Sequence, residues 1–262
     1  GLDANPVLIS TRGHGYAFEF SPLISSMNYL IVQYKEAGNT YYLDASKPRL
    51  GFAKLHYDAY NGHGRVIMEG APSISLVADE LLESNASHFF IGTNDEGSWG
   101  GSVIQQKGHY ESFNIRNEIA GGGQETYFKE LQKKFGNTAT ISGTSIDSLN
   151  KYELPLSLKY KLEFSNEGEE FLYVNPNFGL GFKKNPFSAA ERTYPVEIPY
   201  VQEDLITASI EVPKGYAVDE LPKQMLLKLD PTGKTFYEYR ISQSGDQIYF
   251  SGKLKIAHTI FK

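Results

Sequence analysis

The sequence predicts an α+β fold in which β-strands dominate. The chain of 262 residues holds 18 Tyr and 16 Phe beside many β-branched residues, and such residues favour strands. Its 25 Gly and 12 Pro divide it into short segments. Several segments alternate apolar with polar residues, which is typical of a half-buried strand. Hydrophobic residues make up 40% of the chain, enough for a packed core in one or two domains.

Residues 1–72 are expected to form a small sheet. Residues 6–10 are a short apolar run that suits a buried strand. Residues 28–34 and 39–43 are two more apolar segments, and the Gly38-Asn39 turn that joins them predicts a hairpin. A further turn is predicted at residues 61–64, and a soft domain boundary follows near the end of this region.

Residues 73–262 are expected to form a β-rich domain with a helical insertion near 110–135. Within that insertion, apolar residues on one face indicate a helix over 124–135. Residues 154–164 alternate strictly over eleven positions, which predicts an antiparallel strand with one buried face. Alternation or short apolar runs predict further strands at 88–91, 102–107, 206–212, 235–241 and 248–256. Many short strands between turns favour an antiparallel, sandwich-like domain.

Charge and composition exclude several classes of function. The net charge is −6 and the basic residues are scattered, so a nucleic-acid interface is not expected. No apolar run approaches the roughly 20 residues that span a bilayer. The chain has no cysteine, which excludes a disulfide scaffold, a thiolate zinc site and a cysteine nucleophile within these residues. No cofactor is expected.

Metal and phosphate sites are not indicated. The six histidines never occur at HxH or HxxxH spacing, so a metal site would need distant ones to converge. Asp95-Glu96 lacks the ligand ladder of a calcium loop. The run 121–123 of three glycines lacks the Lys–Ser/Thr pair of a phosphate-binding loop, and we expect it to end one helix and turn into the next.

Trp99 is a candidate ligand contact. It is the only tryptophan and lies in the glycine-rich turn Gly97-Ser98-Trp99-Gly100. An exposed aromatic side chain among glycines could hold a sugar or a peptide. The alternative, a tryptophan packed on its own sheet, is the favoured interpretation.

Several segments resemble bacterial transglutaminase-like proteins. Residues 1–15 resemble the stretch that follows the nucleophile-bearing helix in that family, and the N-terminal match is fairly specific. Residues 27–32 resemble the strand with the catalytic histidine, and residues 41–46 the strand with the aspartate. Three short segments, residues 191–196, 212–216 and 220–222, resemble the uncharacterised β-rich domain that ends many such proteins. The chain thus resembles the C-terminal part of such a protein, with the end of a transglutaminase core.

The resemblance places Tyr29 at the histidine position and Asp44 at the aspartate position. The family chemistry needs a thiolate, an imidazole that carries its proton and a carboxylate that orients the imidazole. A phenol with a pKa near 10 cannot replace an imidazole with a pKa near 6.5 as the proton carrier. We therefore expect vestigial positions and no catalytic residue. Asp44 as the cap of a turn and Tyr29 as a half-buried strand residue are the favoured interpretations, and a hydrogen bond could join them.

Two hypotheses for function follow. The first is a non-catalytic binding or scaffolding module of the cell envelope, periplasmic or envelope-associated, with a signal peptide upstream. It would bind a protein, a peptide or a glycan, and a second copy of the chain could cover the open edge of the partial core. The alternative is a fragment of a transglutaminase-like cysteine peptidase or amidase whose nucleophile lies upstream of residue 1. The residues that precede Gly1 in the parent gene would discriminate between the two.

Overall fold

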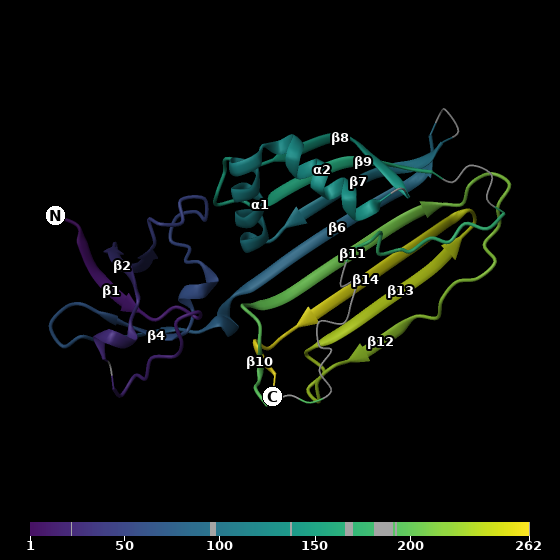
Figure 1. Cartoon of the computed structure of the whole chain (residues 1–262). Helices are drawn as coiled ribbons and strands as arrows, with labels where there is room; N and C mark the ends of the chain where they lie inside the picture. Colours follow the sequence, from purple (N-terminus) through teal and green to yellow (C-terminus); the bar gives the residue numbers. More distant parts are fainter. Residues whose placement is uncertain are drawn as a thin grey trace.

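The structure is a computed structural model, and two sheets dominate it. It describes residues 1–21, 23–94, 98–136, 138–165, 170–180, 191 and 193–261. Figure 1 shows the smaller sheet at the left, the larger sheet at the right and two helices over one end of the larger sheet. The chain passes from the smaller to the larger sheet between β5 and β6. The predicted β-dominant α+β class is confirmed.

The smaller sheet has five strands in the order β3-β2-β1-β4-β5, and all neighbours are antiparallel. Its strands are β1 (Asp3–Ile9), β2 (Tyr29–Glu36), β3 (Asn39–Leu43), β4 (Gly62–Val66) and β5 (Ser73–Leu76). The predicted hairpin is present as β2 and β3. Ala37 and Gly38 form its turn, both with positive φ (50° and 81°), as tight hairpin turns require. Three short 3-10 helices lie at Ile24–Ser26, Tyr57–Ala59 and Ala78–Glu80.

Strand β4 replaces the turn that the sequence predicts at residues 61–64. Its two glycines allow close packing instead of a chain reversal, Gly62 against the Tyr16 ring and Gly64 against β1. A Cβ at Gly64 would lie 2.8 Å from the Cγ2 of Ile9 and 3.0 Å from the Cγ1 of Val7. Only a residue without a side chain lets the two strands pair at this point, and the turn prediction was therefore wrong.

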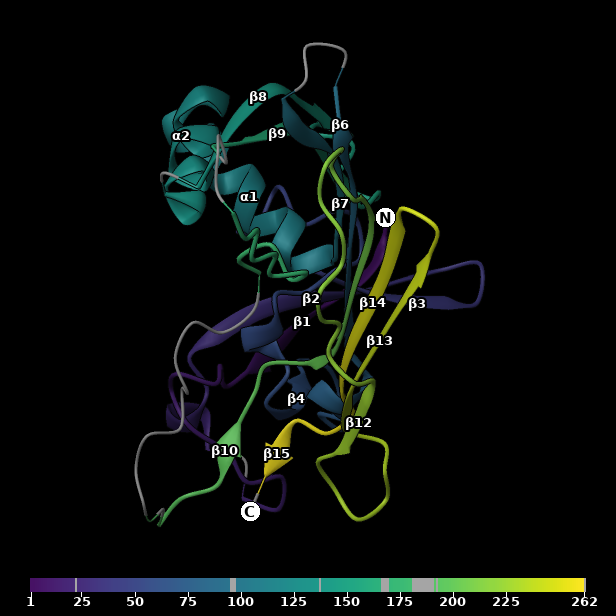
Figure 2. The same ribbon diagram turned by 90° about the vertical axis from the view of Figure 1, so that its right-hand side faces the viewer.

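The larger sheet has eight strands in the order β12-β13-β14-β11-β6-β7-β9-β8. Figure 2 shows that it curls. Its strands are β6 (Leu82–Thr93), β7 (Trp99–Lys107), β8 (Ala139–Asp147), β9 (Leu156–Phe164), β11 (Val201–Glu211), β12 (Met225–Lys228), β13 (Phe236–Ser244) and β14 (Gln247–Ile256). A separate two-stranded sheet pairs β10 (Val196–Glu197) with β15 (Ile260–Phe261).

One strand pair in the larger sheet is parallel. β6 and β11 pair in parallel from Leu82 opposite Val201 to Ile91 opposite Ile210, whereas all other neighbours are antiparallel. The pair joins two antiparallel halves, β12-β13-β14-β11 and β6-β7-β9-β8, that lie far apart in the sequence. A parallel pair needs a crossover connection, and here the chain between the two strands contains both helices.

Two helices cover the end of the sheet formed by β6, β7, β9 and β8 (Figures 1 and 2). Helix α1 spans His109–Gly122 and α2 spans Gln124–Phe135, which confirms the predicted insertion. Gly123 separates them with a φ of 82°, and its N–H donates to the Ile119 carbonyl, as expected for a residue that ends a helix. The core beneath them includes Phe89, Val103, Leu158 and Leu162, each at most 2% exposed.

A buried carboxylate from the sheet fixes the start of α1. Gly108 precedes the helix and has no side chain to cap it. The carboxylate of Glu83 on β6, 1% exposed, accepts hydrogen bonds from the N–H groups of Tyr110 (3.0 Å) and Glu111 (2.9 Å). A Cβ at Gly108 would lie 2.4 Å from the Glu83 carboxyl carbon, so glycine is required there. Burial raises the pKa of Glu83, and the backbone hydrogen bonds oppose that rise.

Candidate functional site

Tyr29, Asp44 and Ser46 form a closed group of hydrogen bonds, here named the tyrosine cluster. Tyr29 is the first residue of β2, and Asp44 and Ser46 follow the end of β3. The Tyr29 hydroxyl donates to Asp44 Oδ2 at 2.8 Å and also contacts the Ser46 hydroxyl. The N–H of Ser46 donates to Asp44 Oδ1 at 2.8 Å. The hydrogen bond expected between Tyr29 and Asp44 is thus present, and the three side chains satisfy one another.

The chemistry open to the tyrosine cluster is narrow. Burial raises the pKa of Tyr29, the hydrogen bond with Ser46 lowers it, and the Asp44 hydrogen bond and charge raise it further. The phenol therefore stays protonated at neutral pH and acts as a donor to Asp44. No imidazole hydrogen-bonds to the Ser46 hydroxyl among the described residues, so this serine has no base to activate it.

The His56 imidazole makes its contacts outside the tyrosine cluster. Its Nδ1 lies 3.2 Å from the Asp58 carboxylate and accepts a hydrogen bond from the Asp58 N–H at 3.4 Å. Its ring packs 4.0 Å from the centre of the Tyr57 ring. Burial lowers the pKa of His56, while the neighbouring Asp58 charge opposes that shift. The imidazole is therefore part of the packing between the two sheets.

Trp99 has the environment of a core residue. It is 8% exposed, its indole N–H donates to the Glu211 carbonyl at 3.3 Å, and its ring lies 4.9 Å from that of Phe164. Of the two interpretations that the sequence left open, this environment agrees with a tryptophan packed on its own sheet. The ligand contact stays a prediction.

No group of three or more potential metal-ligating side chains forms within the described part of the chain. Asp95 and Glu96 lie outside the described residues. Neither α1 nor α2 is long or apolar enough to cross a membrane, and the described residues contain no other helix that could.

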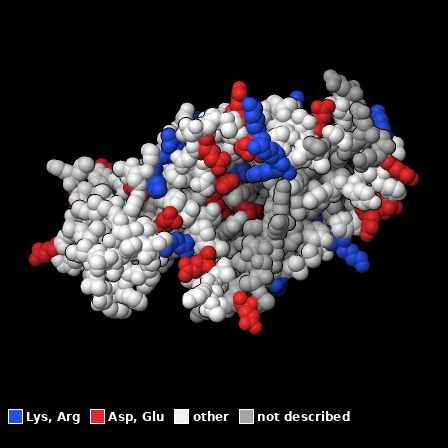
Figure 3. Space-filling view, viewed as in Figure 1, with Lys and Arg blue, Asp and Glu red and all other residues white. Residues whose placement is uncertain are grey.

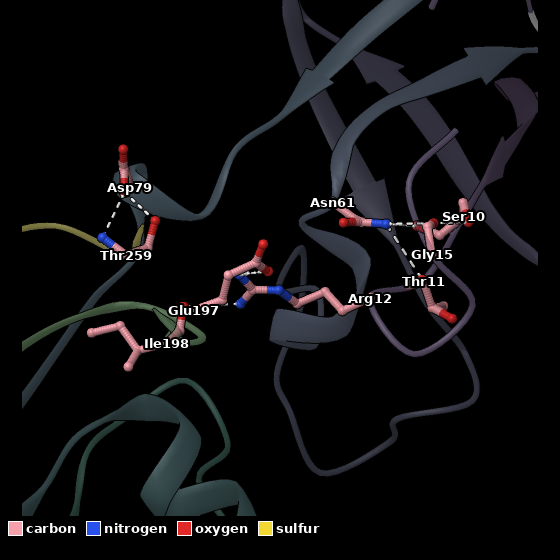
Figure 4. Close-up of polar contacts among 9 residues, drawn as sticks. All are labelled: Ser10, Thr11, Arg12, Gly15, Asn61, Asp79, Glu197, Ile198 and Thr259. Carbon is pink, nitrogen blue, oxygen red and sulfur yellow. Dashed lines mark hydrogen bonds and ion pairs between the residues drawn. The ribbon is translucent and has the colours of Figure 1, made fainter. Parts of the chain in front are cut away.

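Polar contacts tie the first part of the chain to the two-stranded sheet of β10 and β15, and Figure 4 shows them. The Arg12 guanidinium, in the loop after β1, donates to the Ile198 carbonyl at 3.2 Å and lies 3.8 Å from the Glu197 carboxylate of β10. Asp79, in the 3-10 helix before β6, accepts hydrogen bonds from the N–H (3.1 Å) and the hydroxyl of Thr259, which precedes β15. These contacts join segments that lie far apart in the sequence.

Three tyrosines from different segments form the apolar part of this junction. Tyr110 of α1 stacks on Tyr200 with ring centres 5.1 Å apart, and Tyr57 meets both rings edge-on at 5.5 and 5.8 Å. The Tyr110 hydroxyl donates to the Leu55 carbonyl at 3.3 Å. Burial raises the pKa of Tyr110 and of Tyr200. Helix α1 is therefore held between both sheets.

Arg116 anchors the opposite side of α1. Its side chain is 2% exposed, and its Nε and Nη2 donate to four backbone carbonyls, those of Ser148, Leu149, Lys151 and Leu154, at 2.9–3.0 Å. Burial lowers the pKa of Arg116, and the charges of Tyr152 and Glu153 oppose that shift. One guanidinium thus satisfies the carbonyls of the loop before β9.

The structure also contains a pocket that the sequence did not indicate, here named the sheet pocket. It is a cavity of about 250 Å³ between α1, the face of the larger sheet and residues 177–180. Figure 3 shows acidic and basic side chains around a hollow near the middle of the molecule, where the helices meet the sheet. Its lining comes from β6, β7, β11, β13 and β14 as well as from α1. No motif marks these residues, because only the strand register brings them together.

The chain is similar to known proteins in part of its sequence and in its fold. Residues 170–262 match the model of a family described as a domain of unknown function with a solved structure, DUF3858. No curated protein matches the chain. A crystal structure from Parabacteroides distasonis, described as a "putative protease", aligns with 100% of this chain at 10% sequence identity and a TM-score of 0.45. The chain spans 35% of the length of that protein.

Proposed function

We propose that this chain is a non-catalytic binding or scaffolding module related to transglutaminase-like proteins. One observation carries the proposal: Tyr29 stands where those proteins are expected to carry the catalytic histidine, and its hydroxyl is bound to Asp44 and Ser46. A side chain that both lacks a titration near neutral pH and is held by two partners does not shuttle protons.

The junction between the two sheets supports a structural role. Arg12, Asp79 and the stacked tyrosines connect segments that lie far apart in the sequence. A rigid connection of this kind suits a module that presents a surface. Catalysis by a thiol would in addition require a nucleophile, and these residues include no cysteine.

The alternative is a fragment of a cysteine peptidase or amidase whose nucleophile lies outside these residues. Asp44 favours it to a limited degree, because a carboxylate at this strand end is what such a site needs to orient an imidazole. Tyr29 opposes it, since the Asp44 carboxylate hydrogen-bonds to Tyr29 and Ser46, and no imidazole among the described residues hydrogen-bonds to it; only its charge reaches His56.

The test is an assay of both reactions that the resemblance suggests. The parent protein and its Tyr29→His and Asp44→Asn variants are incubated with an amine and a glutamine-containing protein, and separately with peptide amides. We expect no crosslinking and no hydrolysis above buffer from any of them, and no gain from Tyr29→His. Turnover by the unmodified parent protein that Asp44→Asn abolishes would establish the enzyme alternative.

We also propose, from the resemblance, that the parent protein resides in the cell envelope and that the chain self-associates. Apolar side chains on the smaller sheet motivate the second point: Leu2 is 78% exposed and Leu30 on β2 is 56% exposed. Fractionation of a tagged parent protein tests the location. Light scattering across a concentration series tests self-association, and a constant monomer mass would contradict it.

A further inference from the structure

The floor of the sheet pocket consists of two rows of side chains that cross neighbouring strands. In the first row, Asp204 of β11 lies between Asn85 of β6 and Leu254 of β14, and Leu254 is followed by Tyr237 of β13. The polar end of this row is at β6, and the apolar end is at β14 and β13. The pocket is thus polarised along the sheet.

The second row continues the floor beside the first. Ile206 of β11 lies between Ser87 and Gly252. Gly252 carries no side chain, and the Phe250 ring lies close above it, because a Cβ there would be 3.0 Å from that ring. The apolar part of the lining comes from Leu180, Leu205, Ile206, Tyr237 and Leu254.

The polar end holds two charged side chains. Lys107 at the end of β7 and Glu111 in the first turn of α1 both line the pocket. Neither makes a side-chain hydrogen bond or an ion pair with any residue in the described ranges, although the Glu111 charge acts on the Lys107 amine through space. In contrast, Asp204 accepts hydrogen bonds from Asn85 (2.9 Å) and Gln202. Lys107 and Glu111 are therefore the charged groups of the pocket that are open to a ligand.

We infer that the sheet pocket binds a small zwitterion with an apolar side chain, the chemistry of a free apolar α-amino acid. Its carboxylate faces the Lys107 ammonium, its ammonium faces Glu111 and Asp204, and its side chain lies on Ile206 and Leu254. The inference goes beyond the proposed non-catalytic role and does not depend on it, because the pocket and the tyrosine cluster belong to different sheets.

Size and charge both favour this ligand class. The cavity of about 250 Å³ is below the usual range for drug-sized ligands and suits a small molecule. β7 and β11 lie on either side of β6, so their backbones are about 10 Å apart, and a charged head between Lys107 and Asp204 would lie above Asn85 of β6. A simple anion would meet two carboxylates, and a simple cation would meet the lysine.

The groups around Lys107 shift the pKa of its amine in opposite directions. Burial lowers the pKa of Lys107, and the charge of Lys134 lowers it too, whereas those of Glu111, Asp204 and Glu83 raise it. A ligand carboxylate beside the amine would favour its charged form.

The experiment uses isothermal titration calorimetry with two matched series. Leucine is compared with 4-methylpentanoate, which lacks the ammonium, and with isopentylamine, which lacks the carboxylate. Phenylalanine, 3-phenylpropanoate and phenethylamine form the second series. We expect at least one amino acid to bind saturably, with a Kd of about 1 mM or lower. Each of its single-charge analogues should bind about tenfold more weakly or worse.

Two variants test which residue binds the carboxylate of the ligand and which binds its ammonium group. Lys107→Met should weaken the amino acid about tenfold and leave the amine unchanged, whereas Glu111→Gln should weaken the amino acid and leave the carboxylate unchanged. Lys161→Met, on the exposed face of β9, is the matched control and should bind as the unmodified chain does. Circular dichroism verifies that each variant is folded.

Three results would overturn the inference: no binding in either series by the folded chain, equal binding of the amino acid and its analogues, or equal affinity of Lys107→Met and Lys161→Met. These calorimetric results are separate from the turnover assays, so the ligand class and the non-catalytic role can fail independently.

Discussion

The tyrosine cluster and the sheet pocket treat their polar groups in opposite ways. In the smaller sheet, Tyr29, Asp44 and Ser46 hydrogen-bond to one another near the surface. In the larger sheet, Lys107 and Glu111 face a cavity and make no side-chain hydrogen bond or ion pair in the described part of the chain. The tyrosine cluster uses its donors and acceptors internally, whereas the charged groups at the pocket are open to a ligand of the class inferred above. Resemblance drew attention to the first site, but unpaired charge identifies the second.

The two sites also differ in what holds them. Buried charged side chains bound to backbone fix α1, which forms one wall of the pocket, whereas the tyrosine cluster is a surface feature of a hairpin. The comparison therefore predicts that substitutions around α1 cost much more stability than substitutions in the cluster.

Arg116→Met should have the largest effect. The variant removes the guanidinium from four carbonyls of residues 148–154, of which those of Ser148 and Lys151 keep a backbone N–H donor, and it buries an apolar side chain against them. We expect a loss of about 3–5 kcal/mol in the free energy of unfolding. Urea denaturation measures it. Arg240→Met is the control, because that side chain is 69% exposed and pairs only with Glu238, and it should stay within about 0.5 kcal/mol of the unmodified chain.

Glu83→Ala should lower the free energy of unfolding by about 2–3 kcal/mol, because it leaves two buried N–H groups at the start of α1 without their carboxylate acceptor. Hydrogen exchange of Tyr110 and Glu111 should accelerate in this variant. Glu69→Ala, at an exposed position, serves as the control. Unchanged exchange at the start of α1 would show that the helix does not depend on its sheet-borne cap.

His109 should make stability depend on pH. Burial lowers the pKa of His109 to about 4, and the charges of Lys54 and Arg116 act in the same direction. The pKa of His109 is near 6.5 in the unfolded chain and about 4 in the folded one. At pH values between these two, the unfolded chain binds more protons than the folded chain, so the free energy of unfolding falls as the pH falls.

After allowance for solvent screening, we expect a loss of about 1–2 kcal/mol from pH 7 to pH 4 that His109→Gln removes. Thermal unfolding at a series of pH values measures it. An identical pH profile in the variant would mean that other groups, such as His56, control the acid response.

Tyr29→Phe should have the smallest effect, about 0.5–1.5 kcal/mol, because Asp44 and Ser46 are near the surface and water can replace the lost hydroxyl. Urea denaturation measures it beside Arg116→Met. A loss as large as that of Arg116→Met would contradict the contrast between the two regions, and the cluster would then be a main anchor of the smaller sheet.

The sequence predicted the elements whose pattern reflects burial on one face. β9, β11 and β14 were found by alternation, and α2 by its apolar face. β8 and β12 were missed because they lie at the two edges of the larger sheet. All four residues of β12 are exposed, so no burial imposes a period on them.

The two candidate sites also differ in how far the sequence predicts them. The pairing of Tyr29 with Asp44 could be expected because both belong to one hairpin with a readable turn. The sheet pocket could not, since the parallel register that places Asp204 beside Asn85 leaves no mark in the sequence of either strand. Long-range register is a property of the folded sheet, and one sequence does not reveal it.

The parallel pair of β6 and β11 also constrains the order in which the chain folds. The paired residues Leu82 and Val201 lie about 120 residues apart, and closing so long a loop is entropically costly and slow. Each antiparallel half can assemble from near neighbours in the sequence, so their joining should come late. Until then, β6 and β11 each have an unpaired edge. Residues 170–262 alone would keep the β11 edge open permanently, and we expect that fragment to aggregate unless another strand covers it.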